Sequence, residues 1–403
     1  MPTKYLVLRT TEPFDESSFP LSSPRAWEAM KREKGGGPDL VIQTMDGHEA
    51  DVGSLRADPC NVAVMDAEVA LGLIEPKSQA PANATTLRQV GAVKMPDGLV
   101  AVGAHTTPFT GQGVTVAILD TGIDENHPSF KGKTIVKKDF TGEGTNDQDV
   151  IDNVGHGTHC AATICAASVG DIRVGVAFGV VKLCVGKVLG SLGGSLEMLL
   201  KGLLWAVLEQ KASVVSMSLG YDLAGNTKRM IARGVDPALA ANAAMRQQSD
   251  IIKGISTLKA FLESQLPNVV FVAATGNESE RPKFVLDAGL PAAELFSVGA
   301  VGSTGDKWNI APFSNARAQV VAPGVDVVSA APGGGWAVMS GTSMATPHVA
   351  GVAALWTEKL RNEGVLNVPE SVRSAIKSHA VRQPLLTMDL SAIGVGLVQA
   401  PQI

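Results

Sequence analysis

The sequence has few cysteines for its length. Four cysteines, Cys60, Cys160, Cys165 and Cys184, are spread over 403 residues, which is too few for a fold held together by disulfides. We therefore expect free thiols. A zinc site built from His159 and the last three cysteines is conceivable, but their spacing matches no standard pattern of zinc ligands. No metal site is predicted.

Long apolar runs and an excess of basic residues are also missing. The N-terminus carries only the short apolar run Tyr5–Leu8 before polar residues follow, so no secretory signal is visible and we expect a cytoplasmic protein, with export by another signal left open. No apolar run is long enough to cross a bilayer, so no membrane partner is expected. The 34 basic residues are outnumbered by 39 acidic ones, which argues against nucleic acid as a partner.

What the chain does have is enough apolar residues, 45% of the total, for one large domain and a smaller one. Short strands at Tyr5–Leu8, Leu40–Ile42 and Val62–Val64 and a helix at Trp27–Lys31 predict a small α+β unit over residues 1–76. The composition then shifts to Ser, Ala, Pro, Asn and Thr after Pro76, which predicts a linker over residues 77–110. The large domain is expected over residues 111–403.

Buried strands alternate with helices in the large domain. Near-continuous apolar runs between helices predict a mostly parallel sheet with helices on both faces, a three-layer α/β fold. The expected strands are Val114–Leu119, Val181–Val188, Val214–Leu219 and Val269–Ala274, with helices after His156 and over Leu196–Leu208. Two further helices, Met230–Ala244 and Ile251–Gln265, are expected as a surface excursion.

A nucleophile is suggested by the stretch SGTSMATPHVAG at residues 340–351. The apolar periodicity that follows predicts a helix beginning near Ser343, with Pro347 in its first turn, where the missing N–H would have no partner. Backbone N–H groups then converge beside Ser343 and favour a developing anion. Gly341 has no side chain, so another chain segment can approach the backbone there.

Three polar residues are expected at the carboxyl edge of the predicted sheet, where ligands of such sheets gather. Asp120 ends one strand, Asn277 follows another, and His156 lies between two glycines before a helix. Serine acyl transfer needs a base, a carboxylate that orients it and donors for the oxyanion. We assign His156, Asp120 and Asn277 to these roles beside Ser343; Asp124 is the rival acid, but it lies in the following turn.

The motifs that carry these residues resemble those of the subtilisin-like serine peptidases. They are ILDTGID at residues 118–124, GHGTHCAATI at 155–164, SMSLG at 216–220, ATGNES at 274–279 and GTSMATPHVAG at 341–351. The resemblance runs from about residue 111 to 397. It implies a serine endopeptidase with an acyl-enzyme on Ser343, and an oxyanion hole formed by Asn277 and the Ser343 N–H.

The resemblance also implies how a polypeptide substrate binds. Family members hold it as an extended strand, here against Ser218, Leu219 and Gly220, with Gly193 and Gly194 lining the opposite side. Such pairing involves mainly the substrate backbone.

Some positions depart from the family pattern. Ser129 replaces an aspartate that binds calcium in many members, and residues 167–171 replace the usual Asn-rich calcium loop. We expect that no cofactor is required. Structural calcium is possible, but calcium at this site is doubtful because its usual ligands are absent. Cys160 resembles a cysteine of thiol-dependent members that lies beneath the catalytic histidine. It is either a target for bulky mercurials or a buried spectator thiol.

The N-terminal unit resembles a family propeptide in position and size, and Val62–Glu75 resembles the closing strand of one. It is expected to dock on the peptidase domain and to block the cleft; a permanent accessory domain is the alternative.

Two rival functions remain in view. A catalytically silent member would use the cleft only to hold peptides, which the intact Asp120, His156, Asn277 and Ser343 argue against. An esterase on another α/β fold would need a G-x-S-x-G elbow with the acid and histidine after the serine. Here Ala345 stands where the second glycine is needed, and both partners precede Ser343.

Overall fold

The structure is a computed structural model that describes residues 3–10, 40–47, 52–66, 69–82, 87–221, 223–289, 292, 294–365 and 371–402. The helix expected at Trp27–Lys31 lies outside these residues.

A sheet of eight strands forms the centre of the molecule, in the order β16-β15-β14-β12-β8-β10-β9, with β17 also paired to β15. All its pairs are parallel except β15 with β16. The strands are β8 (Thr115–Asp120), β9 (Thr134–Asp139), β10 (Lys182–Lys187), β12 (Val214–Met217), β14 (Val270–Ala274), β15 (Phe296–Thr304), β16 (Lys307–Ile310) and β17 (Val320–Pro323).

Helices cover both faces of this sheet. On β8, Val116 and Ile118 pack into the apolar core that contains α4 (His156–Cys165) and α8 (Thr342–Asn362). The alternate residues Ala117 and Leu119 pack into the core that contains α5 (Leu196–Leu204), its π-helical continuation η4 (Trp205–Glu209) and α7 (Pro237–Gln265). The three-layer α/β prediction is confirmed. The remaining short elements are η3 (Pro128–Phe130), α9 (Ser371–His379) and α10 (Leu390–Ile393).

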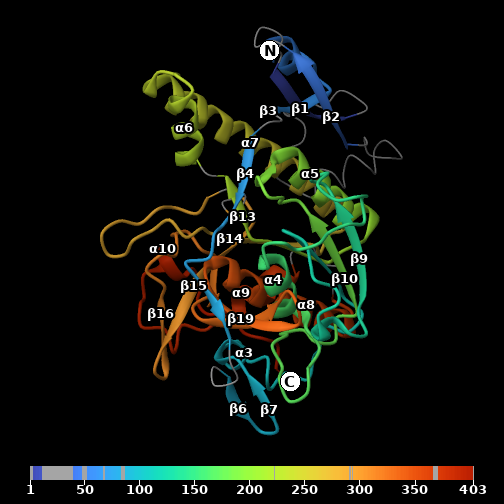
Figure 1. Ribbon diagram of the computed structural model, residues 1–403, viewed down its shortest axis with the longest axis vertical. Helices are drawn as coiled ribbons and strands as arrows, with labels where there is room; N and C mark the ends of the chain where they lie inside the picture. The colour runs from blue at the N-terminus through green and yellow to red at the C-terminus, as the bar shows by residue number, and fades with distance from the viewer. Residues whose placement is uncertain are drawn as a thin grey trace.

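The N-terminal region forms a separate three-stranded antiparallel sheet at the top of Figure 1, with the order β2-β1-β3. Its elements are β1 (Thr3–Thr10), β2 (Leu40–Gly47), α2 (Val52–Ala57) and β3 (Asn61–Asp66), so the three expected strands are present. Leu8 and Met65 pack into the same apolar core as Ile255 of α7. Arg56 pairs with Asp250 of α7 at 2.7 Å.

Residues 70–81, which we call the strap, run from this sheet down the middle of the molecule as the blue ribbon of Figure 1. Their first half is β4 (Ala70–Leu73), which lies between β11 (Gly194–Ser195) and β13 (Leu219–Tyr221). Their second half is β5 (Ser78–Pro81), which pairs with β19 (Gly335–Ser340); β18 (Val327–Ala331) lies on the other side of β19. The strap is antiparallel to β13 and β19.

Residues 77–110 differ from the predicted linker. Besides β5 they form the hairpin of β6 (Arg88–Val90) and β7 (Val93–Met95), followed by α3 (Asp97–Ala101). Leu99 and Val102 are fully buried in the core of the large domain. Because this burial involves single apolar residues in and directly after a five-residue helix, it leaves no periodic pattern in the sequence.

The surface excursion divides at another point than predicted. It consists of α6 (Leu223–Ala232) and the 29-residue α7, so the break falls before Pro237 and not between Ala244 and Ile251. Asp236 caps α7 by accepting hydrogen bonds from the N–H groups of Ala238 and Leu239. An aspartate before a proline is a helix-start signal, and it marks the observed boundary.

Among the described helices, none combines the length and apolarity that a membrane span requires.

The burial of α3 predicts the effect of Leu99→Ala. We expect it to lower the free energy of unfolding by about 2–5 kcal/mol, the usual cost of emptying a buried leucine site. Gln89→Ala, at an exposed position of the same segment, is the control and should stay within about 0.5 kcal/mol of the parent. Chemical denaturation measures both, and equal small effects would restore the linker interpretation.

Candidate active site

Asp120 and His156 form a buried pair at the carboxyl end of β8. Asp120 is the last residue of that strand and His156 the first residue of α4. The Oδ1 atom of Asp120 lies 2.8 Å from Nδ1 of His156, and both side chains are almost completely shielded from water. This bond fixes the ring so that Nε2 is the nitrogen left for proton transfer.

The electrostatics of His156 reflect two opposing effects. Burial lowers its pKa, because an imidazolium loses hydration there, but the negative charge of Asp120 and the hydrogen bond to it favour the protonated ring. The pKa of His156 lies well above its usual 6.5 as a result.

A second buried carboxylate, that of Asp152, ties the two loops of this pair together. It accepts hydrogen bonds from the hydroxyl of Thr121, which follows Asp120, and from the N–H of Gly155, which precedes His156. Its other oxygen accepts from the N–H and hydroxyl of Thr158 at 2.8 and 2.6 Å. Asp152 is therefore a positioning residue for the Asp120–His156 pair.

Ser343 is the second residue of α8, which begins at Thr342. The prediction for Pro347 is wrong in detail, because it is the sixth helical residue and lies past the first turn. Its missing N–H leaves the carbonyl of Ser343 without a helical donor. That carbonyl accepts instead from the Ser218 hydroxyl at 3.2 Å and from the Cys160 thiol at 3.3 Å.

Asn277 follows β14 and has both ends of its amide engaged. Its Oδ1 accepts from the N–H and the hydroxyl of Thr342, each at 2.9 Å. Its Nδ2 donates to the carbonyl of Glu75 at 2.9 Å. Thr342 therefore sets the orientation in which the amide N–H group faces the cleft, beside Gly341, where an added Cβ would come within 2.9 Å of Nδ2.

The five predicted substrate-binding residues surround the first half of the strap. Gly220 lies opposite Gly72 and Leu219 opposite Leu73, and the carbonyl of Ser218 accepts from the N–H of Ile74 at 3.3 Å. On the other side Gly194 lies opposite Leu71. Gly193 has φ +87°, and a Cβ there would come within 2.8 Å of the Leu71 carbonyl, so only glycine fits.

The strap presents two consecutive carbonyls to the catalytic groups. The Ser343 hydroxyl donates to the carbonyl of Ile74 at 2.9 Å, whereas the Asn277 amide binds the carbonyl of Glu75. Attack requires nucleophile and oxyanion donor to act on the same carbonyl. Since the Ser343 hydroxyl and the Asn277 amide bind the carbonyls of different residues, neither peptide bond is held for cleavage. The proton of the Ser343 hydroxyl is also donated to the Ile74 carbonyl of the strap.

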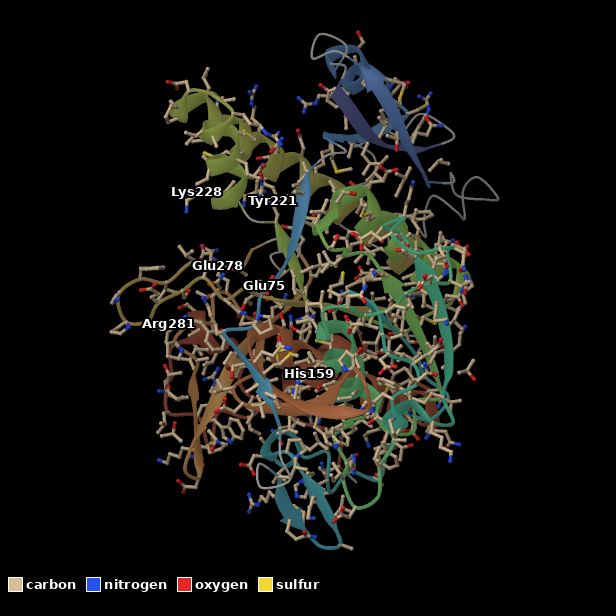
Figure 2. The ribbon with its side chains drawn as sticks, in the orientation of Figure 1. Glu75, His159, Tyr221, Lys228, Glu278 and Arg281 are labelled. Carbon is tan, nitrogen blue, oxygen red and sulfur yellow. The ribbon has the colours of Figure 1, made fainter. Side chains whose placement is uncertain are left out.

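A cavity of about 670 Å³ borders Ile74. In Figure 2, Tyr221 and Lys228 lie above the labelled Glu75, and Glu278 lies between Lys228 and Glu75. The walls combine the strap, β13 and α6 with the loop after β14, and include Ile74, Tyr221, Leu223, Lys228, Glu278 and Leu286. The side chain at the Ile74 position therefore meets a largely apolar pocket with charged groups at its edge.

His159, His348 and the rival acid Asp124 have structural roles. His159 and His348 are fully buried and bond the carbonyls of Val327 and Met344, and burial lowers their pKa values to about 3 and about 4. Asp124 accepts from the N–H groups of Asn126 and Gly333, so it holds the turn and not the catalytic histidine.

The thiol of Cys160 lies 3.8 Å from Nδ1 of His156. It is fully buried, and burial raises its pKa, which keeps it protonated. None of the four cysteines, all of which lie in the described part of the chain, takes part in a disulfide. Within the described part of the chain, Asp120, His156 and Cys160 are the group of side chains close enough to share a metal ion, and this group contains the acid–base pair itself.

Comparison with known proteins gives the family. The model of the subtilase family matches residues 111–396. The chain belongs to the subtilase family. An intracellular serine protease of Paenibacillus polymyxa is 36% identical over 299 residues, which are 72% of this chain and 81% of that protein. The major intracellular serine protease of Bacillus subtilis is 34% identical over 271 residues, 65% of this chain and 75% of that protein.

A third relative matches more of the N-terminal region. Alkaline elastase YaB of a Bacillus species is 34% identical over 362 residues, which are 88% of this chain and 80% of that protein. A match of this length does not fit within residues 111–403, so it includes part of the first 110 residues. Taken together, the subtilase family and its relatives make this chain a serine-type endopeptidase of the subtilisin-like class.

Three features of this subtilase site escaped the sequence analysis. Asp152 and Thr342 are polar residues in or beside turns, where such residues occur for many reasons. The residues Ile74 and Glu75 were placed at the end of the N-terminal unit, but nothing in their side chains indicates that their carbonyls face Ser343 and Asn277.

The contacts of Asn277 predict the effect of Thr342→Val. Loss of the hydroxyl removes one of the two bonds that orient the amide, worth about 0.5–1.5 kcal/mol, so kcat should fall about 3- to 10-fold with little change in KM. Asn277→Ala should cost about 10²–10³ in kcat, a range taken from a subtilisin.

Thr357→Val is the matched control for Thr342→Val, because Thr357 is also a buried threonine of α8 and bonds only to a helix carbonyl, that of Ala353. Steady-state kinetics should show normal kcat for it. Equal losses in the two threonine variants would mean that the effect arises from the helix and not from Asn277.

Proposed function

We propose that Ser343 is the nucleophile, His156 the general base and then general acid, Asp120 the residue that orients it, and Asn277 an oxyanion donor. The observation that supports this assignment most strongly is the strap. A polypeptide segment of the chain itself passes through the site with its carbonyls at the Ser343 hydroxyl and the Asn277 amide.

In the proposed reaction, Ser343 Oγ attacks the carbonyl carbon of a substrate peptide bond while His156 Nε2 takes the hydroxyl proton. The negative oxygen of the tetrahedral intermediate is held by the Asn277 amide and by the N–H of Ser343, which lies at the start of α8 and has no acceptor within the helix. His156 then gives the proton to the leaving amine. After the amine leaves, water attacks the acyl-enzyme carbonyl while His156 takes its proton. His156 then gives a proton to Ser343 Oγ as the ester bond breaks, which releases the carboxylic acid product and restores the serine.

We also propose that residues 1–76 are an inhibitory propeptide that docks on the peptidase domain. Three observations support this. The strap fills the cleft, its two carbonyls are displaced by one residue from a cleavable arrangement, and the match to alkaline elastase YaB extends into this region. A permanent accessory domain remains the alternative, and a chain that keeps Met1 and cleaves casein at full rate would establish it.

We propose a cytoplasmic location, which is supported by the word intracellular in the names of two relatives. We propose that catalysis requires no cofactor and that structural calcium, if the protein binds it, lies at another place than the loop of residues 167–171. The carboxylate of Asp171 in this loop is already paired with Lys94 at 3.0 Å. Nucleic acid is not a proposed partner, in keeping with the net charge of −5.

The proposed roles predict a single reactive serine. Intact-mass analysis of the purified chain before and after treatment with a fluorophosphonate should show one adduct, and Ser343→Ala should show none. The mass before treatment reports whether the N-terminal unit has been removed.

Two outcomes would contradict the proposals separately. A folded, shortened chain without an adduct would indicate a catalytically silent member of the family. If the intact chain reacts with the fluorophosphonate at the same rate as a shortened one, Ser343 remains the assigned nucleophile, but the propeptide proposal is wrong.

The raised pKa of His156 predicts the pH dependence. The base must be neutral to accept the Ser343 proton, so kcat/KM should fall as the pH drops through a value above the usual 6.5. In Asp120→Asn the charge that raises this pKa is gone, so the acid limb should move to lower pH while kcat drops by about 10⁴. A profile whose acid limb in the parent lies below pH 6.5 would contradict the assignment.

A further inference from the structure

We propose that the edge of β19 that β5 occupies in the structure is a binding strand for the part of the substrate that follows the scissile bond, and that it recognises the backbone of that part over about seven residues. The inference rests on the peptidase function proposed above. It concerns the end of the cleft that holds the strap beyond Glu75, past the part bordered by Ser218–Gly220.

The strap shows the extent of this strand. Beyond Glu75, β5 pairs with β19 in a continuous antiparallel register from Ser78 opposite Ser340 to Pro81 opposite Ala337. Backbone bonds continue at both ends. The N–H of Lys77 donates to the carbonyl of Ser340 at 2.7 Å, and the N–H of Ala82 to that of Trp336 at 2.9 Å.

The strap is held here through its backbone. All four residues of β5 are exposed, so their side chains bury little apolar surface against the domain. Addition of an extended chain to a sheet edge gives affinity through main-chain hydrogen bonds and needs no particular sequence. A substrate polypeptide that replaces the strap finds the same unpaired N–H and C=O groups on β19.

The antiparallel pairing of β5 with β19 also indicates which substrate residues would form hydrogen bonds with β19. In antiparallel pairs, hydrogen-bonded and non-bonded positions alternate. Since Ala82 bonds to Trp336, the N–H groups of Ala80 and Ser78 face β19, and the positions of Gln79 and Pro81 face away. Lys77 lies before the paired residues 78–81 and departs from this alternation, because its N–H also bonds to Ser340. Pro81, which has no N–H, stands at a position that needs none.

Strand β19 is held rigidly and leads directly into the nucleophile. At its start, His127 Nε2 lies 2.8 Å from the carbonyl of Gly335, and the His127 ring packs edge-on against Trp336. At its end, Ser340 is three residues before Ser343. A substrate paired with this strand therefore has its scissile bond placed by the same backbone that carries the catalytic serine.

Substrate length tests the inference. Peptides would carry the sequence of residues 71–74, Leu-Gly-Leu-Ile, joined directly to alanine-rich tails of two, four or seven residues, and cleavage after the isoleucine would be followed by mass spectrometry. The full chain is used, and each kcat/KM is divided by that of the shortest peptide so that the fraction of molecules with an open cleft cancels. We expect an increase of about tenfold from two to seven tail residues, as several backbone hydrogen bonds of modest net value would give.

N-methylation of the longest peptide supplies a matched control. Counted from the bond whose carbonyl meets Asn277, the fifth residue corresponds to Ala80 and the fourth to Gln79. A methyl group on the fifth nitrogen should remove most of the gain, because it blocks a bond to β19. The same group on the fourth nitrogen should leave the rate within about twofold, because that N–H faces away.

Equal rates for all tail lengths, or equal effects of the two methyl groups, would overturn the β19 proposal while leaving the peptidase function intact. Failure to cleave any of the peptides, together with no fluorophosphonate adduct on a chain whose mass shows that the N-terminal unit has been removed, would overturn the peptidase function on which the proposal rests.

Discussion

The shared carboxyl edge of three neighbouring parallel strands is the constraint on which the site depends. In the sheet β14, β12 and β8 lie side by side, and directly at or after their ends come Asn277, Ser218 and Asp120. A strand between two covered faces cannot slip by one residue without exchanging the side chains that pack into the two cores. The relative heights of these three polar residues are therefore set by the core, before any contact among them forms.

The helices complete the site by bringing groups to this edge from one side. α4 begins with His156 and α8 with the turn around Ser343, and both pack into the same apolar core. The carbonyl of Ser343 joins them, since it accepts from Cys160 of α4 and from Ser218 after β12. Pro347 makes this possible by withholding the helical N–H that would otherwise occupy that carbonyl. The missing N–H of Pro347 and the thiol of Cys160 thus help to connect α8, α4 and the segment after β12.

Much of this arrangement could be predicted from the sequence because it has strong side-chain signatures. Apolar runs marked β8, β12 and β14, and the polar residues after them fell in motifs with a known chemistry. The family comparison and the three-layer fold bear out that interpretation. Asp152 could not be singled out from the sequence. An aspartate in a polar turn has the same sequence pattern whether it is exposed or, as here, buried and the acceptor of five hydrogen bonds.

The course of residues 77–110 could not be predicted for a different reason. β5 is exposed and held by main-chain bonds, which any residue can form, so its sequence looks like a linker. α3 is only five residues long, too short for a periodic pattern, although Leu99 is fully buried. The division between α6 and α7 was present in the sequence as Asp236 followed by Pro237, a signal that outweighs the apolar periodicity on either side.

The strap has a further consequence because the chain continues through it into the large domain. A segment tethered in this way has a local concentration at the cleft that is set by the chain and does not fall when the protein is diluted. One cut between the strap and α3 would turn the binding of the strap to the cleft from an intramolecular step into a bimolecular one. The segment would then be a separate molecule, and the fraction of clefts that it occupies would depend on the concentration of this protein. The same contacts would keep the cleft closed where the protein is concentrated and leave it open where the protein is dilute.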